Sequence, residues 1–368
     1  MLEPENHIAL AFANFGTGGA QRAMTYLANE LVRKGWSVQV LVFREDPKIY
    51  DITRHKNLQI IELGSSLHEQ IVSLNRWQKQ NSDIPILATQ ENVIRVFLLA
   101  GKIFLRNTIV IREANRIGAT RPSGKSWLWA PFMKFLYTRA NGFISLSSAV
   151  QEDLRKFTDY RDVSIPLIKN AIDVDTVELK GQEELDHEWF SCETDVPVVI
   201  GVGRLVMQKD FANLVSAVAL ARKTRRIRLL LLGTGQLREQ LLSLGNKLNF
   251  GDDFQIMEFQ SNPYKYMKRS DVYVLSSKWE GSPNTLLEAM ALGMKIVACD
   301  CPSGPRELIT NHKIGKLVDV GDAEQLAIAI LQSIAAVHDP EYIIEYTKAK
   351  HDIAPWAEQY IAAIGCAK

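Results

Sequence analysis

Short apolar runs recur along the whole chain and alternate with segments whose apolar positions follow a helical period. In the first half, these runs predict strands at residues 7–13, 37–43, 58–63, 84–90, 108–114, 142–147 and 163–168. Helical patterns separate most of them, as at 19–35 and 147–157. Alternation of this kind predicts a parallel sheet that is covered by helices on both faces.

The alternation is interrupted once, at residues 171–195, which are acidic and show no clear period. It then restarts, with strand-like runs at residues 196–203, 227–233, 254–258, 271–277, 295–300 and 315–320. The pattern therefore predicts an α/β protein with two doubly wound domains joined near residue 180. Ligands of such sheets bind at the carboxyl ends of strands, so a cleft shared by the two domains is the expected site.

Composition narrows the class of protein. The 368 residues are enough for about two domains, and the net charge of +1 gives no indication of a nucleic-acid partner. The start of the chain carries acidic residues before its first apolar run, so we expect no secretory signal, and no apolar run is long enough to span a bilayer.

The four cysteines lack a zinc-binding pattern, and we expect reduced thiols.

Three glycine-rich turns follow predicted strands. Their glycines are Gly16, Gly18 and Gly19, then Gly201 and Gly203, then Gly233 and Gly235. Each turn alone is a weak signal, because glycine is common at such turns for steric reasons. The first turn lacks the third glycine of a dinucleotide fingerprint, and Arg44 follows the second strand where an acidic residue would be required. A nicotinamide cofactor is therefore not expected.

The second turn adds two cations, Arg204 and Lys209. An arginine can bind two phosphate oxygens at once and a lysine supplies a mobile point charge, so the pair suits a diphosphate. The alternative is that both are solvated surface charges.

The segment "SSKWEGSPNTLLEAMALG", residues 276–293, carries two glutamates, Glu280 and Glu288. Ser282 is expected to cap a helix with Pro283 at its first position, and the N–H groups that follow would then bind phosphate. One carboxylate lies on each side of this phosphate site, as recognition of a nucleotide sugar requires. Two glutamates at this spacing also occur as a solvated pair.

Taken together, the motifs "GVGRLVMQKD", "LLLGTGQLREQL", "YMKRSDVYVLSSKWEGSPNTLLEAMALGMKIVACD" and "PSGPRELI" resemble glycosyltransferase family 4. The first half matches more loosely, through "GTGGAQRAM", "FISLSSAVQEDL" and "IKNAIDVD". The resemblance implies a GT-B fold, with two Rossmann-like domains facing a central cleft. The N-terminal domain, residues 1–180, would bind the acceptor, and residues 181–340 would bind the nucleotide sugar. Residues 341–368 would form a helical segment that can cross back to the N-terminal domain.

The resemblance also assigns roles to residues. Arg204 and Lys209 would hold the donor diphosphate and stabilise the leaving nucleotide. Glu288 would accept hydrogen bonds from the ribose, and Glu280 would contact the transferred sugar. The other donor-binding residues expected from the resemblance and the helix start are Gly18, Gly19, Gly203, Gly235, Ser282, Asn284, Thr285 and Leu286. Family members retain the anomeric configuration and generally need no metal or other cofactor.

One departure from the family pattern lies in "IVIREANRIG". Many relatives carry a histidine after the glutamate, and here Ala114 takes its place. We expect Glu113 to be catalytic or to position the acceptor, together with Arg112, Asn115 and Arg116. The alternative is that Glu113 only pairs with a neighbouring arginine.

Residues 95–139 combine nine Lys or Arg with one Glu, a net charge of +8. The same stretch also contains aromatic residues, among them Trp127, Trp129, Phe132, Phe135 and Tyr137. Such a surface suits an anionic membrane. The alternative is a packed helix with a core stripe formed by Leu128, Phe132, Phe135 and Leu136. A nucleic acid could use the same charges, but no binding motif is present.

The sequence thus predicts a retaining glycosyltransferase that uses a UDP-hexose or UDP-N-acetylhexosamine donor. Its expected acceptor is a lipid-linked glycan of bacterial surface-polysaccharide assembly, and its expected location is the cytoplasmic face of the plasma membrane. Two other classes remain open. A nucleotide-sugar 2-epimerase of the same fold would turn over donor without acceptor, and a non-catalytic membrane-docking protein would have no need of Arg204, Lys209, Glu280 and Glu288 together.

Overall fold

The computed structural model describes residues 6–16, 18–44, 52, 55–114, 126–158, 165–191, 195–302 and 304–367. The chain divides into two compact units, Met1–Ala171 with Ile353–Lys368, and Ile172–Asp352. It enters the second unit before residue 180, because Ile172, Val174 and Val177 pack into that unit's core. The segment beginning at residue 341 is divided between the units at Ile353.

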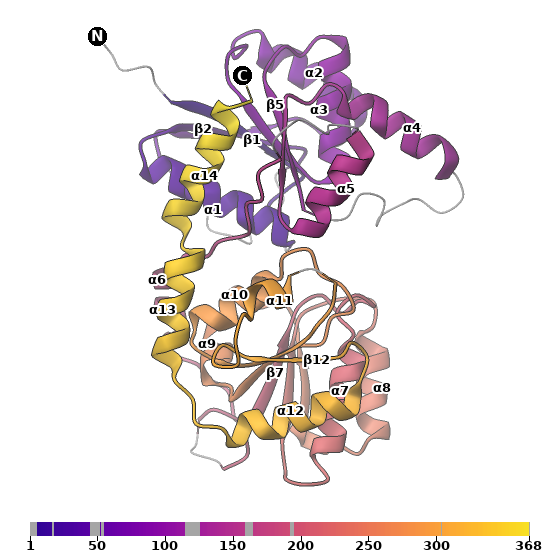
Figure 1. The fold of residues 1–368 in the computed structure, drawn as a ribbon, viewed down its shortest axis with the longest axis vertical. Coiled ribbons are helices and arrows are strands. Elements are labelled where there is room, and N and C mark those ends of the chain that lie inside the picture. The colour runs from indigo at the N-terminus through magenta and orange to yellow at the C-terminus, as the bar shows by residue number, and fades with distance from the viewer. Residues whose placement is uncertain are drawn as a thin grey trace. The chain divides into compact units, whose positions relative to one another are not determined.

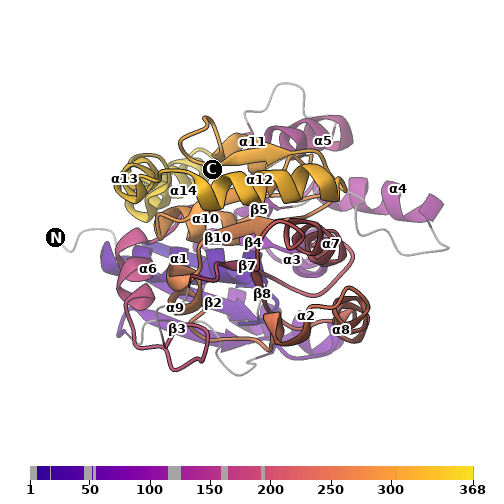
Figure 2. The same ribbon diagram turned by 90° about the horizontal axis from the view of Figure 1, so that it is seen from below.

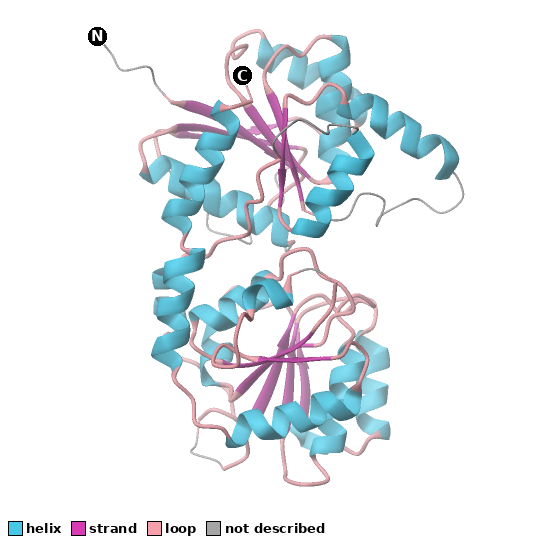
Figure 3. Ribbon diagram, viewed as in Figure 1, coloured by secondary structure: helices cyan, strands magenta, loops and turns pink. Residues whose placement is uncertain are grey.

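Unit 1 is a six-stranded parallel sheet in the order β3-β2-β1-β4-β5-β6, with helices on both faces (Figure 1, Figure 3). Alternate residues of β1 face opposite sides: Ala9 and Ala11 join one core cluster, and Ile8 and Leu10 join the other. Its strands are β1 (His7–Phe12), β2 (Ser37–Val42), β3 (Leu58–Glu62), β4 (Ile86–Thr89), β5 (Ile109–Glu113) and β6 (Gly142–Ser145). Its helices are α1 (Gly19–Arg33), α2 (Leu67–Gln78), α3 (Glu91–Ile103), α4 (Ser126–Tyr137), α5 (Ser148–Thr158) and α14 (Ile353–Gly365).

Unit 2 repeats this plan, with the order β12-β11-β10-β7-β8-β9 and all pairs parallel. Figure 2 shows α7 and α12 side by side on one face of the sheet. Its strands are β7 (Val198–Val202), β8 (Arg228–Leu232), β9 (Phe254–Met257), β10 (Val272–Leu275), β11 (Lys295–Cys299) and β12 (Lys316–Val318). Its helices are α6 (Val174–Gly181), α7 (Phe211–Ala221), α8 (Arg238–Lys247), α9 (Tyr264–Arg269), α10 (Asn284–Ala291), α11 (Pro305–Leu308), α12 (Ala323–Ala335) and α13 (Pro340–His351), with a 3-10 turn at Gly251–Asp253.

The predicted α/β class and the predicted strands are therefore confirmed, with one exception. Of the run predicted at 163–168, the described part, residues 165–168, forms an isolated bridge between Ser145 and Leu167 and no strand. Pro166 has no N–H to donate, and its carbonyl accepts from Ser145 N–H at 2.9 Å. A segment with a missing donor cannot continue a full ladder, so the sheet ends at β6.

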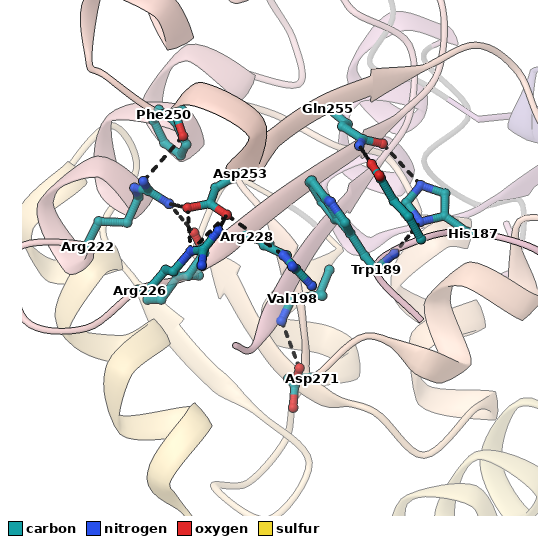
Figure 4. Close-up of polar contacts among 12 residues, drawn as sticks. His187, Trp189, Val198, Arg222, Arg226, Arg228, Phe250, Asp253, Gln255 and Asp271 are labelled. Atoms are coloured by element: carbon teal, nitrogen blue, oxygen red, sulfur yellow. Dashed lines mark hydrogen bonds and ion pairs between the residues drawn. The ribbon is translucent and has the colours of Figure 1, made fainter. Parts of the chain in front are cut away.

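Charged residues form a network at the amino-terminal ends of strands β8 and β9 in unit 2 (Figure 4). Asp253 accepts hydrogen bonds from Arg222 Nη1 at 2.7 Å and from Arg226 Nη2 at 2.9 Å, and Arg228 Nε lies 3.8 Å from it. Burial raises the pKa of Asp253, but the hydrogen bonds from Arg226 and Arg222 outweigh it, so the net pKa is lowered. The carboxylate is therefore more stable in the folded chain than in the unfolded one.

This network predicts an acid-dependent loss of stability. A lowered folded pKa contributes stability above the unfolded pKa of about 3.9, and this contribution disappears as the pH falls through the folded value. Asp253→Asn is expected to lower the free energy of unfolding by about 2 kcal/mol at pH 7. Urea unfolding at pH 7 and pH 3 should show this difference shrinking in acid, whereas the exposed neighbour Asp252→Asn should change little. A difference that is equal at both pH values would contradict the assignment.

Candidate active site

The two predicted donor loops meet where the strand order of unit 2 reverses. β7 and β10 are neighbours, with Val272 opposite Val199, but the chain continues from them toward opposite edges of the sheet. Ligand sites of doubly wound sheets form at this point. Backbone and side-chain bonds join the two loops: Lys278 N–H donates to the Gln208 carbonyl at 2.8 Å, and Gln208 Nε2 donates to the Trp279 carbonyl at 2.9 Å.

Lys209 and Glu280 form the charged centre of these loops. Lys209 Nζ lies 2.7 Å from Glu280 Oε1, and their side chains are 13% and 7% exposed. Ser277 Oγ donates to the same Oε1 at 2.6 Å, and the Ser276 hydroxyl donates to the Lys209 carbonyl at 2.7 Å. A shielded ion pair of this kind is strong only when further hydrogen bonds satisfy its charged groups; Ser277 supplies one to the carboxylate, and Ser276 fixes the backbone of Lys209. The structure thus brings together two residues that the sequence assigned separately to the diphosphate and the sugar.

Gly203 makes room for this pair. Its φ is +154°, and a Cβ atom there would lie 3.1 Å from Lys209 Cε. The lysine stem therefore crosses directly over the glycine on its way to Glu280. Arg204, the next residue, has an exposed side chain that forms no ion pair within the described part of the chain. It is available to a ligand without losing an internal partner.

The loops after β7 and β8 are also locked together. Leu205 N–H donates to the Thr234 carbonyl at 2.8 Å, and Leu237 N–H donates to the Leu205 carbonyl at 3.1 Å. A Cβ atom on Gly235 would lie 2.4 Å from that Leu205 carbonyl oxygen, and one on Gly233 would lie 1.9 Å from the Gly203 carbonyl oxygen. Both glycines have positive φ. Backbone packing therefore requires them, whether or not Gly235 also lies along a nucleoside.

The start of α10 differs from the sequence prediction. The cap is Pro283 rather than Ser282, and no side chain caps the helix. Leu286 N–H donates to the Pro283 carbonyl at 3.0 Å, so it serves the first turn of the helix and would have to give up this bond to meet a phosphate. The first turn itself has no acidic residue, a condition that favours an anion at the positive end of the helix dipole.

Two further residues on or beside α10 are held inside unit 2. Tyr273 donates its hydroxyl to Thr285 Oγ1 at 2.7 Å, which orients the first turn of the helix. Burial raises the pKa of Tyr273, so this phenol stays neutral and remains a donor. Glu288 is 1% exposed on the same helix. Its role as a ribose acceptor remains a prediction.

In unit 1, Glu113 ends β5 and is 9% exposed. Tyr137 of α4 donates its hydroxyl to Glu113 Oε2 at 2.9 Å. Burial, and then the Glu113 charge, raise the pKa of Tyr137 well above its usual value, so the phenol remains a donor. Glu113 therefore has a tyrosine partner, Tyr137, that no pattern in the sequence indicates. Asn115 and Arg116 lie outside the described residues.

Arg112, expected to contact an acceptor, instead has a structural role in unit 1. Its side chain is 0% exposed, with Nε donating to Tyr360 Oη at 2.8 Å and Nη2 donating to Asn170 Oδ1 at 2.6 Å. Tyr360 belongs to α14, the helix that follows unit 2 and packs beside α1 (Figure 1). A guanidinium enclosed by these partners cannot reach a ligand, and it fixes the C-terminal helix to the sheet.

The first glycine turn leads into α1. Gly18 is the helix cap, no side chain caps the helix, and its first turn has no acidic residue. These are favourable conditions for an anion at the helix start. Gly18 and Gly19 therefore remain candidates for contact with phosphate.

Cysteine and metal chemistry add little to this site. Cys299 and Cys301 are buried free thiols, and burial raises their pKa values to about 11 and about 12. Cys192 lies outside the described residues. Across those residues, no group of three or more His, Cys, Asp or Glu side chains is arranged to hold a metal ion.

Two family models match the chain, one in each half. "Glycosyl transferases group 1" matches residues 183–350, and "Glycosyltransferase Family 4" matches residues 17–176. The first match contains Arg204, Lys209, Glu280 and Glu288, the residues of the unit 2 site.

Curated relatives and solved structures agree with these matches. The chain is 30% identical to the N-acetylgalactosamine-N,N'-diacetylbacillosaminyl-diphospho-undecaprenol 4-alpha-N-acetylgalactosaminyltransferase of Campylobacter jejuni, over 53% of this chain and 51% of that protein. It is 25% identical to the lipopolysaccharide core biosynthesis glycosyltransferase LpsD of Rhizobium meliloti, over 86% of this chain and 85% of that protein. The alignments to three of the curated relatives span between 36% and 51% of their lengths.

Among solved structures, the chain is similar to Anabaena Alr3699/HepE in complex with UDP and glucose. The TM-score is 0.77 at 18% identity, and the alignment covers 97% of this chain and 99% of that one. At this identity, the similarity shows the fold, which is GT-B with two Rossmann-like domains.

Proposed function

Since the chain belongs to glycosyltransferase family 4, we propose that it transfers a hexose or N-acetylhexosamine from a UDP-linked donor to a glycan acceptor, with retention of configuration. The observation that carries this proposal is the shielded Lys209–Glu280 pair where the strand order of unit 2 reverses. It places a cation for a leaving diphosphate beside a carboxylate for sugar hydroxyls. Exposed Arg204 in the same loop supplies a second cation.

The chemistry of these residues favours donor binding without a metal. Two cations and uncapped helix starts can neutralise a diphosphate that other enzymes bind through magnesium. A lipid-linked glycan is the proposed acceptor, because the aligned Campylobacter jejuni relative is named for an undecaprenol-linked substrate. The proposed place of action is the cytoplasmic face of the plasma membrane.

A thermal-shift panel tests the donor. Purified protein is incubated with UDP-, GDP-, ADP- and dTDP-sugars, each with and without EDTA. A UDP-hexose or UDP-N-acetylhexosamine is expected to raise the melting temperature most, because a ligand that binds only the folded state stabilises it. The shift should be unchanged by EDTA. A larger shift with another base would overturn the UDP assignment, and loss of the shift with EDTA would overturn metal independence.

Unit 1 carries a surface suited to the membrane, which we call the α3–α4 surface. It consists of the exposed apolar residues Ile103, Phe132 and Phe135 and the exposed cations Lys102, Arg106 and Lys134. Phe132 and Phe135 are 48% and 58% exposed, so they are not part of the core stripe expected as the alternative. Leu136 of that stripe is buried as expected, but the helix register turns Met133 and Tyr137 inward beside it in place of the two phenylalanines.

Not every cation of residues 95–139 is at the surface or without hydrogen-bond partners, as the sequence alone would suggest. Arg112 is buried, and Arg139 donates to the carbonyls of Gly101 and Leu105 at 3.0 and 2.8 Å. Lys102 Nζ lies 4.4 Å above the Phe135 ring, so cation and aromatic ring occupy one place on the surface. Exposed aromatics beside cations match the boundary of an anionic bilayer. Within the described ranges, no helix is both long and apolar enough to cross a bilayer.

Vesicle co-sedimentation tests this surface. Lys102→Glu with Lys134→Glu reverses two charges, each worth about 1 kcal/mol at an anionic surface, and should release the protein from anionic vesicles. Phe132→Ser with Phe135→Ser should remove the part of the binding that survives high salt. Ile328→Ser, which removes an exposed isoleucine of unit 2, is the matched control. Equal sedimentation of all variants would show that the α3–α4 surface is only a solvated face. Arg121 and Lys125, at which the sequence also predicts membrane contact, lie outside the described residues.

A further inference from the structure

The strand order of unit 1 reverses between β1 and β4. Just beyond the last paired residues of these two strands, a side-chain oxygen accepts the hydrogen bond that a backbone carbonyl would accept in a continued ladder. β1 and β4 pair through Ala11 and Ala88, and Ala9 N–H donates to the Pro85 carbonyl at 2.9 Å. If the ladder continued with the same spacing, Ala13 N–H would donate to the carbonyl of Thr89. Ala13 N–H instead donates to the side-chain Oε1 of Gln90 at 2.8 Å.

This bond fixes the first residue of the glycine-rich turn from one side. On the other side, the Ala13 carbonyl accepts from Phe43 N–H at 3.0 Å, at the end of β2. The next residue, Asn14, holds the turn internally, because its Oδ1 accepts from Gly16 N–H at 3.1 Å. The chain then enters α1 through Gly18. Gln90 is therefore the contact through which β4 holds the start of this turn.

The backbone of Gln90 is in a costly conformation. Its φ of 74° and ψ of 130° lie outside the regions that residues with a Cβ atom ordinarily adopt. Such strain persists only where the surrounding structure enforces it, and it concentrates at functional sites. Gln90 precedes α3 but its side chain does not cap that helix. In this conformation its carbonyl accepts from Ile94 N–H at 2.9 Å at the start of α3, while its side chain accepts from Ala13 N–H.

Unit 2 has an equivalent contact at its own reversal point. There the loops after β7 and β10 are joined by the side chains of Lys209 and Glu280, and in unit 1 the loops after β1 and β4 are joined by Gln90. We propose that Gln90 is a positioning residue, which holds Ala13 and Asn14 at the start of the glycine-rich turn and thereby allows the start of α1 to receive a phosphate group of the donor. This inference rests on the proposed function of that turn.

Three substitutions separate positioning from stability. Gln90→Leu removes the acceptor and keeps the strain. Gln90→Gly removes the acceptor and relieves the strain. Gln90→Glu keeps an acceptor oxygen at the same distance along the side chain. Gln59→Leu, at an exposed position on β3 of the same unit, is the matched control.

Amide hydrogen exchange and donor kinetics are then measured on the full chain. Exchange at Ala13 is expected to accelerate about tenfold or more in Gln90→Leu and Gln90→Gly, because the amide loses its partner. In both variants, KM for the donor should rise about tenfold while kcat changes less than threefold. The reason is that part of the free energy of donor binding is then used to order the turn. Gln90→Glu should match the wild type in both measurements. Gln90→Gly should melt no lower than Gln90→Leu.

Each contrary outcome is informative. Unchanged exchange at Ala13 in Gln90→Leu would show that Gln90 does not hold the turn. Faster exchange with an unchanged KM in the stable Gln90→Gly variant would show that holding the turn has no role in donor binding. A wild-type protein without any donor turnover would overturn the proposed function and with it the role in donor binding, and exchange at Ala13 would still decide whether Gln90 holds the turn.

Discussion

Lys209→Ala is expected to lower turnover about 100-fold or more, the range observed when one preorganised charge stabiliser is removed. Under the proposed function, negative charge builds on the diphosphate as the bond to the sugar breaks, and Lys209, which Glu280 holds at 2.7 Å, would stabilise that charge. The substitution also leaves the shielded Glu280 carboxylate without its cation, which adds to the loss. Arg204→Ala should have a similar effect on turnover with little effect on stability, because the Arg204 side chain is exposed.

Steady-state rates with saturating donor, measured on folded variants, check this expectation. Lys223→Ala is the matched control, because Lys223 is an exposed lysine of unit 2 that follows α7 and lies away from the β7–β10 loops. It should retain wild-type turnover. Full activity in either Lys209→Ala or Arg204→Ala would remove these residues from the proposed mechanism.

Gly233→Ala is expected to disrupt unit 2 and its donor site together. The new Cβ atom would lie 1.9 Å from the Gly203 carbonyl oxygen, so the loops after β7 and β8 would have to separate. The φ of +151° adds backbone strain that alanine cannot relieve. A loss of about 4 kcal/mol or more in the free energy of unfolding is expected, the range for a severe backbone conflict.

Gly321→Ala isolates the contribution of the dihedral angle. Gly321 has a φ of +79°, but nothing lies within 4 Å of its added Cβ atom. Its substitution should cost only about 1 kcal/mol, because the strain is present without the clash. Urea unfolding compares the two variants, and donor titration should show weakened binding only in Gly233→Ala. Similar losses in both would mean that loop contact does not explain the requirement for Gly233.

The sequence predicted most of the fold because parallel strands that are buried on both faces form short, nearly continuous apolar runs. Each unit 2 loop carries its candidate residues in one contiguous motif, so the sequence could single out Arg204 with Lys209, and Glu280 with Glu288, one loop at a time. It did not predict that Lys209 would pair with Glu280, 71 residues away, because such a contact depends on which strands become neighbours. The strand order supplies that information only once the sheet is assembled.

Other features had no local signal. Gln90 resembles any polar residue at the end of a strand, and only its dihedral angles and its bond to Ala13 distinguish it. Arg112 was expected to contact an acceptor because it flanks Glu113, but the sequence gives no sign that Tyr360 of the C-terminal helix would bind its side chain. Phe132 and Phe135 have a spacing that fits a core stripe, but the helix register is set by contacts with neighbouring elements rather than by spacing.

Transfer itself is tested most directly by proton NMR of a reaction containing wild-type protein, the donor that gives the largest thermal shift, and a lipid-linked glycan. We expect the nucleoside diphosphate to be released only when the glycan is present, and the new anomeric signal to have the configuration of the donor. Inversion at the anomeric carbon would contradict the retaining mechanism. Consumption of the donor without any glycan would contradict glycosyl transfer and would indicate an epimerase instead.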